Sequence, residues 1–287
     1  FGASRTMQIA QKLYQGIEIE GETIGLITYM RTDGTNLSKD AISTFRYYIK
    51  KEMGNEYLPE NAMNYSGKKA KNAQEAHEAI RPTDIIRTPQ SVKKYLSVDQ
   101  NKRYDLIWSR AISSHMESAK FDRNTITISS IDNDTICKAS GSVLKFDGFL
   151  KIYNNPNKDD DESILPAMNK GLVNIEALLD EQHFTQPPPR YSEASLVKKL
   201  EELGIGRPST YASIISTIAN RGYAEILNKR FFPTDRGKLI SAFLEKLFSK
   251  YVDYNFTAGL EDQLDEITSG KESWIKVLEL FWKDFHN

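Results

Sequence analysis

The spacing of apolar residues changes twice along these 287 residues, and this limits the folds that the chain can adopt. Up to about residue 118, apolar side chains recur at helical spacing. From about Phe121 they alternate with polar ones, as in Thr125-Ile126-Thr127-Ile128, which indicates strands. Helical spacing returns after the stiff linker Gln186-Pro187-Pro188-Pro189. The pattern predicts an α+β protein with a helical domain at 1–118, a β-rich arch or linker domain at 119–189, and a helical domain at 190–287.

The last domain has the order of elements of a winged helix-turn-helix. We expect Ser192 to cap one helix, Gly204-Ile205-Gly206 to form the turn, and Pro208 to start a second helix that ends at Gly222. Two strands should then pair across Asn228-Lys229. This order is typical of DNA-binding domains, although the same shape also occurs as plain packing. Scaffold helices are expected over 234–251, 257–267 and 274–285, and a further strand in the middle domain over 172–178.

Composition excludes several classes of protein. Hydrophobic residues make up 39% of the chain, which is enough for real cores. Cys137 is the single cysteine, so an internal disulfide is excluded and a reducing cytosol is favoured. No apolar run approaches the roughly 20 residues of a membrane helix, so no membrane partner is expected. A net charge of -1 means that any contact with phosphates must be local.

Tyr29 and Arg31 lie two residues apart, where the apolar run Leu26-Ile27 gives way to the polar Asp33-Gly34. Residues two apart on an extended strand share a face, so Arg31 could hold a phosphate that Tyr29 attacks. A free tyrosine has a pKa of about 10 and needs neighbours that stabilise its phenolate before it acts as a nucleophile. The alternative is a half-buried strand that ends in an Asp-Gly turn.

Three blocks of sequence carry a resemblance that covers nearly the entire chain. They are LITYMRTDGTN at 26–36, QEAHEAIRP at 74–82, and a third at 190–223 that contains GIGRPSTYASII at 204–215. In content, order and separation they resemble bacterial DNA topoisomerase I, a branch of the type IA topoisomerases. Met30 favours this branch, since the related topoisomerase III enzymes usually carry proline there. The resemblance implies part of a toroidal fold, cut from a longer chain with a toprim domain before it and zinc-ribbon cysteines after it.

The resemblance also implies a reaction. Tyr29 would attack a backbone phosphorus of single-stranded DNA, release a 3′-hydroxyl and form a 5′-phosphotyrosyl ester. Because the ester keeps the bond energy, resealing would need no ATP, and negatively supercoiled DNA would be relaxed. Arg31 would orient the phosphate and stabilise its charge, and His77 would join the hydrogen-bond network beside the tyrosine.

Other residues have supporting roles by the same resemblance. Thr28 and Asp33 would support the site by hydrogen bonds. The residues expected to bind single-stranded DNA are Arg207, Thr210, Tyr211, Arg221 and Gly222. Tyr211 offers a ring for base stacking, but its place in an apolar helix also allows a core role.

Residues 74–81 are expected to form a helical turn that places His77 and Arg81 on one face. A structural hydrogen-bonding role is the alternative for His77. Glu75, Glu78 and Arg81 receive no role, since salt bridges or caps explain them equally well.

Magnesium is expected from outside this sequence. The family binds Mg²⁺ through a glutamate, a lysine and a DxDxE cluster of the toprim domain, which would therefore be a necessary partner. Asp132-Asn133-Asp134 has the first two acids of such a cluster but Ile136 in the third place. The acidic run at 159–162 is expected to be a solvated loop. We therefore expect no metal site here and no cleavage by this chain alone. The resemblance also implies a monomer that works on the nucleoid in the bacterial cytoplasm.

Two other functions remain open from the residues. A tyrosine recombinase also forms a phosphotyrosyl ester, but it joins the 3′ end and gathers several arginines and histidines around its tyrosine. A non-enzymatic DNA-binding module would rely on residues 192–232 alone.

Overall fold

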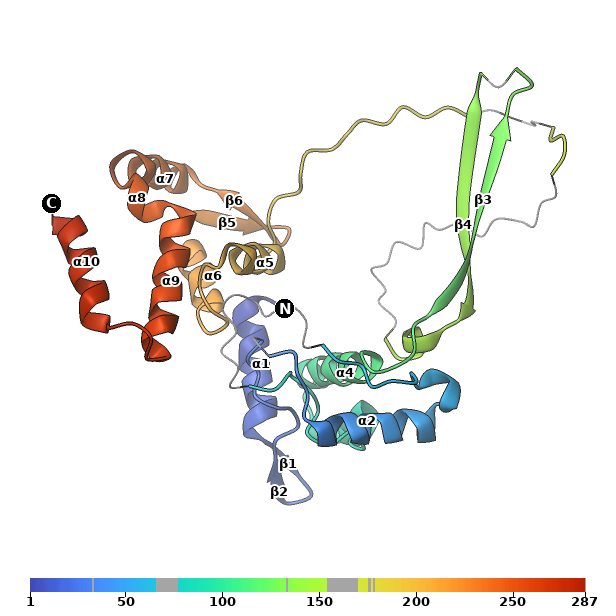
Figure 1. The fold of residues 1–287 in the computed structure, drawn as a ribbon, viewed down its shortest axis with the longest axis horizontal. Coiled ribbons are helices and arrows are strands. Elements are labelled where there is room, and N and C mark those ends of the chain that lie inside the picture. The colour runs from blue at the N-terminus through green and yellow to red at the C-terminus, as the bar shows by residue number, and fades with distance from the viewer. Residues whose placement is uncertain are drawn as a thin grey trace. The chain divides into compact units, whose positions relative to one another are not determined.

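The computed structural model describes residues 1–32, 34–65, 77–132, 134–153, 170–174, 177 and 179–286. Helices and small antiparallel sheets make up this part of the chain, so the predicted α+β class is confirmed (Figure 1). The chain divides into two compact units. One contains Phe1–Ser38, Asn64–Asp105 and Pro188–Asn287, and the other contains Lys39–Met63 and Leu106–Pro187. The predicted domain boundaries near residues 118 and 189 follow a different division and stay a prediction.

The first unit begins with an amphipathic helix and a small hairpin. Helix α1 (Ala3–Gln15) buries Ile9, Ala10 and Leu13. Strands β1 (Ile17–Ile19) and β2 (Glu22–Ile24) pair antiparallel directly after it. This hairpin was not predicted, because strands of three residues show too little alternation to be recognised. It reverses the chain immediately before residues 25–29.

Local capping signals set the next helices. Thr88 accepts a hydrogen bond from the Ser91 amide and precedes Pro89, the first residue of α3 (Pro89–Val92), which leads into a 3-10 turn, η2 (Lys93–Tyr95). Ser97 and Gln100 exchange the two hydrogen bonds of a capping box before α4 (Val98–Ser113). Both helices therefore begin at local signals in the sequence, a cap followed by proline and a capping box.

The second unit has a helical core and a long β-ribbon. Besides the second half of α4, this unit contains α2 (Lys39–Glu52), η1 (Asn55–Tyr57), β3 (Lys120–Ser129), β4 (Ile136–Phe146) and η3 (Gly148–Lys151). Phe45, Ile49 and Ile112 are almost fully buried. The ribbon pairs antiparallel from Lys120↔Phe146 to Ser129↔Ile136, and most of its side chains are exposed. The described residues between 170 and 192 form no strand, so the predicted strand is wrong at 172–174 and 177.

The carboxyl-terminal part of the first unit starts with two helices and a hairpin. The elements are α5 (Glu193–Leu203), α6 (Tyr211–Asn220), β5 (Ala224–Leu227) and β6 (Arg230–Pro233). Ser192 caps α5, and Gly204 ends it in the left-handed conformation, as predicted. The hairpin is also confirmed: Leu227 pairs with Arg230, and both turn residues have positive φ. Helix α6 starts at Tyr211, later than the predicted Pro208, because residues 208–210 form a turn.

Four more helices follow: α7 (Asp235–Leu247), α8 (Ser249–Val252), α9 (Tyr254–Thr268) and α10 (Trp274–His286). The single helix predicted over 234–251 is interrupted at Phe248, whose φ of -130° and ψ of 33° are not helical. Of the helices that the structure describes, none has the length and apolar character needed to cross a bilayer.

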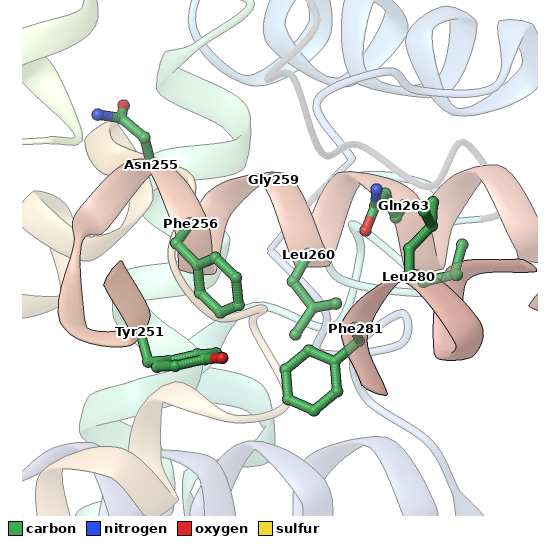
Figure 2. A pocket seen from close by; sticks show the side chains of 9 residues that line it. Tyr251, Asn255, Phe256, Gly259, Leu260, Gln263, Leu280 and Phe281 are labelled. Carbon is green, nitrogen blue, oxygen red and sulfur yellow. The ribbon is translucent and has the colours of Figure 1, made fainter. Parts of the chain in front are cut away.

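A cavity of about 260 Å³ lies among α8, α9 and α10 (Figure 2). Aromatic and aliphatic side chains such as Phe256, Leu260 and Phe281 line it, together with the amides of Asn255 and Gln263. Its lining includes no carboxylate, histidine, cysteine or cation. None of the predicted site residues lines this cavity, so the candidate site lies elsewhere.

Candidate active site

Backbone pairing joins the first two sequence blocks. Ile27 forms an antiparallel bridge with Pro82. The Thr28 amide donates to the Arg81 carbonyl at 2.9 Å, and the Thr83 amide donates to the Leu26 carbonyl at 3.0 Å. Leu26 and Ile27 are buried, because this short pairing lies against the core. Tyr29 directly follows the paired residues, so the pairing fixes the position of its backbone.

The predicted helical turn over residues 74–81 is wrong in its described part, because residues 77–81 carry no helix. The reason is that its backbone groups bond to other segments. The Ala79 amide donates to the Asn36 carbonyl at 2.9 Å, and the Arg81 amide donates to Thr28 Oγ1 at 3.0 Å. Pro82 further disfavours a helical residue before it. Tertiary pairing, rather than helical spacing, places His77.

Thr28 connects the two segments through its side chain. Its hydroxyl donates to the Ala79 carbonyl at 2.8 Å and accepts from the Arg81 amide. Each bond of this kind contributes about 0.5–1.5 kcal/mol net. The contacts of Thr28 are structural, and its support of catalysis stays a prediction.

Two rings hold the ring of Tyr29. The Tyr14 ring approaches edge-on, with centroids 5.1 Å apart and an interplanar angle of 72°. The His77 ring lies on it at 4.8 Å and 32°. Tyr29 nevertheless keeps 36% of its surface exposed. A phenol in this setting has a defined orientation and remains accessible to a ligand.

Tyr14 owes its position to the backbone. The Leu26 amide donates to the Leu13 carbonyl at 2.8 Å, which ties the end of α1 to the segment before Tyr29. At Gly25, a Cβ atom would lie 2.7 Å from the Tyr14 carbonyl oxygen, so only glycine allows this approach. Sequence reasoning did not single out Tyr14. Its only signal is an aromatic residue in the last turn of the helix that precedes the motif.

His77 has a buried ring nitrogen, Nδ1. Its Nδ1 forms no hydrogen bond with any described residue. Its carbonyl packs against Gly34, where a Cβ atom would lie only 2.2 Å from that oxygen. A buried nitrogen left without a hydrogen bond costs about 1–3 kcal/mol, which a bound ligand could recover.

The other predicted members of this site are less defined. Arg31 follows Tyr29 by two residues and its Nε is buried. Asp33 lies outside the described residues, as do Glu75 and the start of the second block. The structure thus brings the rings of Tyr29 and His77 into contact, and it bonds Thr28 to Ala79 and Arg81 of the segment that follows His77.

Glu78 and Arg81, to which the sequence assigned no role, form a structural pair. The two carboxylate oxygens of Glu78 accept from Arg81 Nε and Nη2, each at 3.0 Å. Glu78 also accepts from the Ser38 amide at 2.8 Å, just before α2. Burial raises the pKa of Glu78, but the hydrogen bonds from Arg81 and Ser38 outweigh it and lower that pKa below its ordinary value. The carboxylate therefore fixes the segment that carries His77.

The predicted DNA-binding residues lie at the two ends of α6. Arg207 is buried, and its Nη2 pairs with Asp265 of α9 at 2.8 Å. Its amide donates to Thr210 Oγ1 at 2.9 Å. Tyr211 is half-buried, and burial, followed by the charge of Glu201, raises its pKa. These contacts bring the first three residues together, with the guanidinium of Arg207 directed into the protein.

Arg221 and Gly222 mark the other end of α6. Arg221 is the C-cap residue of α6 and is exposed. Gly222 has a φ of 66°, which favours glycine, and its carbonyl accepts from Thr234 Oγ1 at 2.7 Å. A DNA contact remains a prediction for all five of these residues.

The described residues contain no group of three or more His, Cys, Asp or Glu side chains that suits a metal ion. Asp132 lies in the exposed turn of the β-ribbon, where its carboxylate accepts from the Ser130 hydroxyl and the Asp134 amide. These two hydrogen bonds stabilise the turn. Within the described residues, no group of side chains fits a catalytic Mg²⁺.

Comparisons with known proteins place the chain among related sequences. A family model described as DNA topoisomerase matches residues 1–279. DNA topoisomerase 1 of Rickettsia typhi is 52% identical over 291 residues, which cover 100% of this chain and 37% of that protein. The corresponding protein of Xylella fastidiosa strain 9a5c is 49% identical over 293 residues, covering 99% and 36%.

One solved structure resembles the whole chain. It is full-length topoisomerase I from Thermotoga maritima, with a TM-score of 0.84 and 36% sequence identity. The match covers 100% of this chain and 46% of that one. The chain therefore spans only about 37% of the length of the first curated relatives.

Proposed function

Because this chain belongs to the type IA DNA topoisomerase family, we propose that it provides the nucleophile, Tyr29, of a DNA strand-cleaving and resealing enzyme. The observation that supports this most is the exposed Tyr29 ring held between the rings of Tyr14 and His77. The chain covers 37% of its relatives, so the complete reaction belongs to the longer polypeptide.

In the proposed reaction, Oη of Tyr29 forms a bond to a backbone phosphorus of single-stranded DNA and loses its proton. The bond from that phosphorus to the 3′ oxygen breaks, and this oxygen takes up a proton. A 5′-phosphotyrosyl ester results, and the reverse step reseals the strand without ATP. Arg31 stabilises the charge on the phosphate oxygens, and Nδ1 of His77 gains a hydrogen-bond partner when DNA is bound.

We assign the Mg²⁺ of the reaction to the toprim domain of the family. When bound there, it would supply positive charge near the phosphate during cleavage. The residues described here provide no comparable site. Tyr29 should therefore be in position but unreactive in this chain alone.

We further propose that residues 190–233 act as a winged helix-turn-helix that guides the single strand within a toroidal monomer. Arg207, Thr210, Tyr211, Arg221 and Gly222 would contact this strand, and Asp33 would support Tyr29. The ion pair of Arg207 with Asp265 means that a phosphate must share or replace that carboxylate. The biological substrate would be negatively supercoiled DNA of the bacterial nucleoid.

Relaxation of a negatively supercoiled plasmid tests this proposal. With Mg²⁺, the chain alone should leave the plasmid supercoiled, and addition of a toprim domain of the family should restore relaxation. Tyr29→Phe should abolish the restored activity, whereas Tyr47→Phe, at an exposed tyrosine of α2, should leave it intact. Robust relaxation by the chain alone, or by the Tyr29→Phe variant, would contradict the proposal.

A further inference from the structure

The β5–β6 hairpin buries Phe231, and most of its other side chains are exposed. Phe231 is 8% exposed, whereas its neighbours Arg230 and Phe232 are exposed. Side chains alternate along a strand, so Arg230 and Phe232 share the outer side. The register places Leu227 opposite Arg230 and Glu225 opposite Phe232 on that side. We call these four residues, together with Arg190, the outer hairpin face.

Arg190 is fixed against this face. The Phe231 amide donates to the Tyr191 carbonyl at 2.8 Å, so the segment before α5 runs along β6. The Arg190 guanidinium then lies 4.7 Å from the centroid of the Phe232 ring. Arg230 Nη1 donates to the Arg190 carbonyl at 2.8 Å. The contacts that the structure describes for these two guanidiniums are with a ring and a carbonyl, not with a carboxylate.

The chemistry of the outer hairpin face suits a polyanion whose aromatic ring faces are accessible. Arg190, Arg230 and Lys229 at the hairpin tip provide three cations against the carboxylate of Glu225. A guanidinium stacked on an aromatic ring keeps its N–H edges available for phosphate oxygens. Because both arginines are already held in place, binding would cost less side-chain entropy.

Exposed apolar groups lie beside the cations. Leu227 is 51% exposed and Phe232 is 37% exposed. Such groups can contact the faces of bases only where the bases are unpaired, which favours a single strand over a duplex. We propose that the outer hairpin face binds single-stranded DNA, as a contact additional to those at α6. This inference rests on the proposed function, because it takes DNA as the ligand.

Fluorescence anisotropy with a labelled single-stranded oligonucleotide at several salt concentrations tests the inference on the full 287-residue chain. Each phosphate contact contributes about 0.7 to the slope of log affinity against log salt. Arg190→Gln and Arg230→Gln should each weaken binding and reduce that slope by about 0.7. Phe232→Leu should weaken binding with little change in slope. Lys276→Ala removes a cation of α10 that pairs with Glu272, and it should leave both quantities unchanged.

The outcomes separate this inference from the proposed function. Thermal unfolding followed by circular dichroism identifies any variant that loses its fold, and Arg230→Lys, which keeps the charge, should retain the slope. Unchanged affinity in the folded Arg190→Gln and Arg230→Gln variants contradicts the inference alone, as does tighter binding of a duplex of the same sequence. Absence of any DNA binding by the unmodified chain contradicts both the inference and the proposed function.

Discussion

At the scale of single residues, the orientation of Tyr29 depends on neighbours that are far from it in sequence. Tyr14 and His77 contact its ring from two directions. The motif around Tyr29 was recognisable from the sequence, and so was His77. Tyr14 was not, because its contact results from the hairpin β1–β2 and from the close approach at Gly25. Ring packing of this kind has no signature in one sequence.

Tyr14→Leu should release the Tyr29 ring, because the edge-on contact is lost. Reaction of the chain with N-acetylimidazole, followed by peptide mass spectrometry, should then show faster acetylation of Tyr29. Tyr14→Phe keeps the ring and should react at the original rate. Equal rates in Tyr14→Leu and the unmodified chain would show that Tyr14 does not position Tyr29.

Glu78→Gln should destabilise the chain by about 1 kcal/mol at neutral pH, because hydrogen bonds to an ionised group are lost or weakened. The lowered pKa of Glu78 means that its carboxylate stabilises the fold at pH values above the ordinary glutamate pKa. This contribution is lost as the pH falls through the lowered pKa. Urea denaturation should therefore show a difference at pH 7 that shrinks toward pH 3.

The control for this variant is Glu245→Gln, at an exposed position of α7. It should have a free energy of unfolding close to that of the unmodified chain at both pH values. A difference at Glu78 that stays constant with pH would show that the ionised carboxylate is not the stabilising group.

At the scale of elements, those set by local sequence signals were predicted correctly, whereas those set by tertiary contacts were not. The cap at Ser192 and the two-residue hairpin turn at Asn228 were both predicted correctly. Each depends on residues within four positions of one another. Residues 77–81 were wrongly predicted as helical, since their amides bond to Asn36 and Thr28. A single sequence does not reveal such long-range partners.

Gly34→Ala should disrupt the packing of the segment that carries His77. The new methyl group would lie 2.2 Å from the His77 carbonyl oxygen, and a backbone atom cannot move aside cheaply. We expect a loss of about 1–3 kcal/mol in the free energy of unfolding, measured by urea denaturation.

Gly259→Ala, in the middle of α9, is the matched control for that substitution. A methyl group there meets no atom within 4 Å. Alanine is the better helix former by about 0.8–1.0 kcal/mol, so this variant should be more stable than the unmodified chain. If Gly34→Ala were equally stabilising, this result would contradict the close packing of the His77 carbonyl on Gly34.

At the scale of the whole molecule, we propose that the chain carries one part of a reaction, since it spans 37% of the length of its first relatives. The site places a tyrosine, and the described residues contain no cluster that would hold a metal ion. The sequence predicts this division through its family resemblance and through the lack of a DxDxE cluster, and the division stays a prediction. It did not predict the two compact units, because α4 passes from one to the other without any break in its helical pattern.

Covalent trapping tests the central claim most directly. The chain, a toprim domain of the family, Mg²⁺ and an end-labelled single-stranded oligonucleotide are mixed, denatured rapidly and analysed by gel electrophoresis and peptide mass spectrometry. We predict an adduct in which the 5′-phosphate of the cleaved strand is esterified to Tyr29, and no adduct in Tyr29→Phe. An adduct at the 3′ end, at another residue, or retained in Tyr29→Phe would contradict this account.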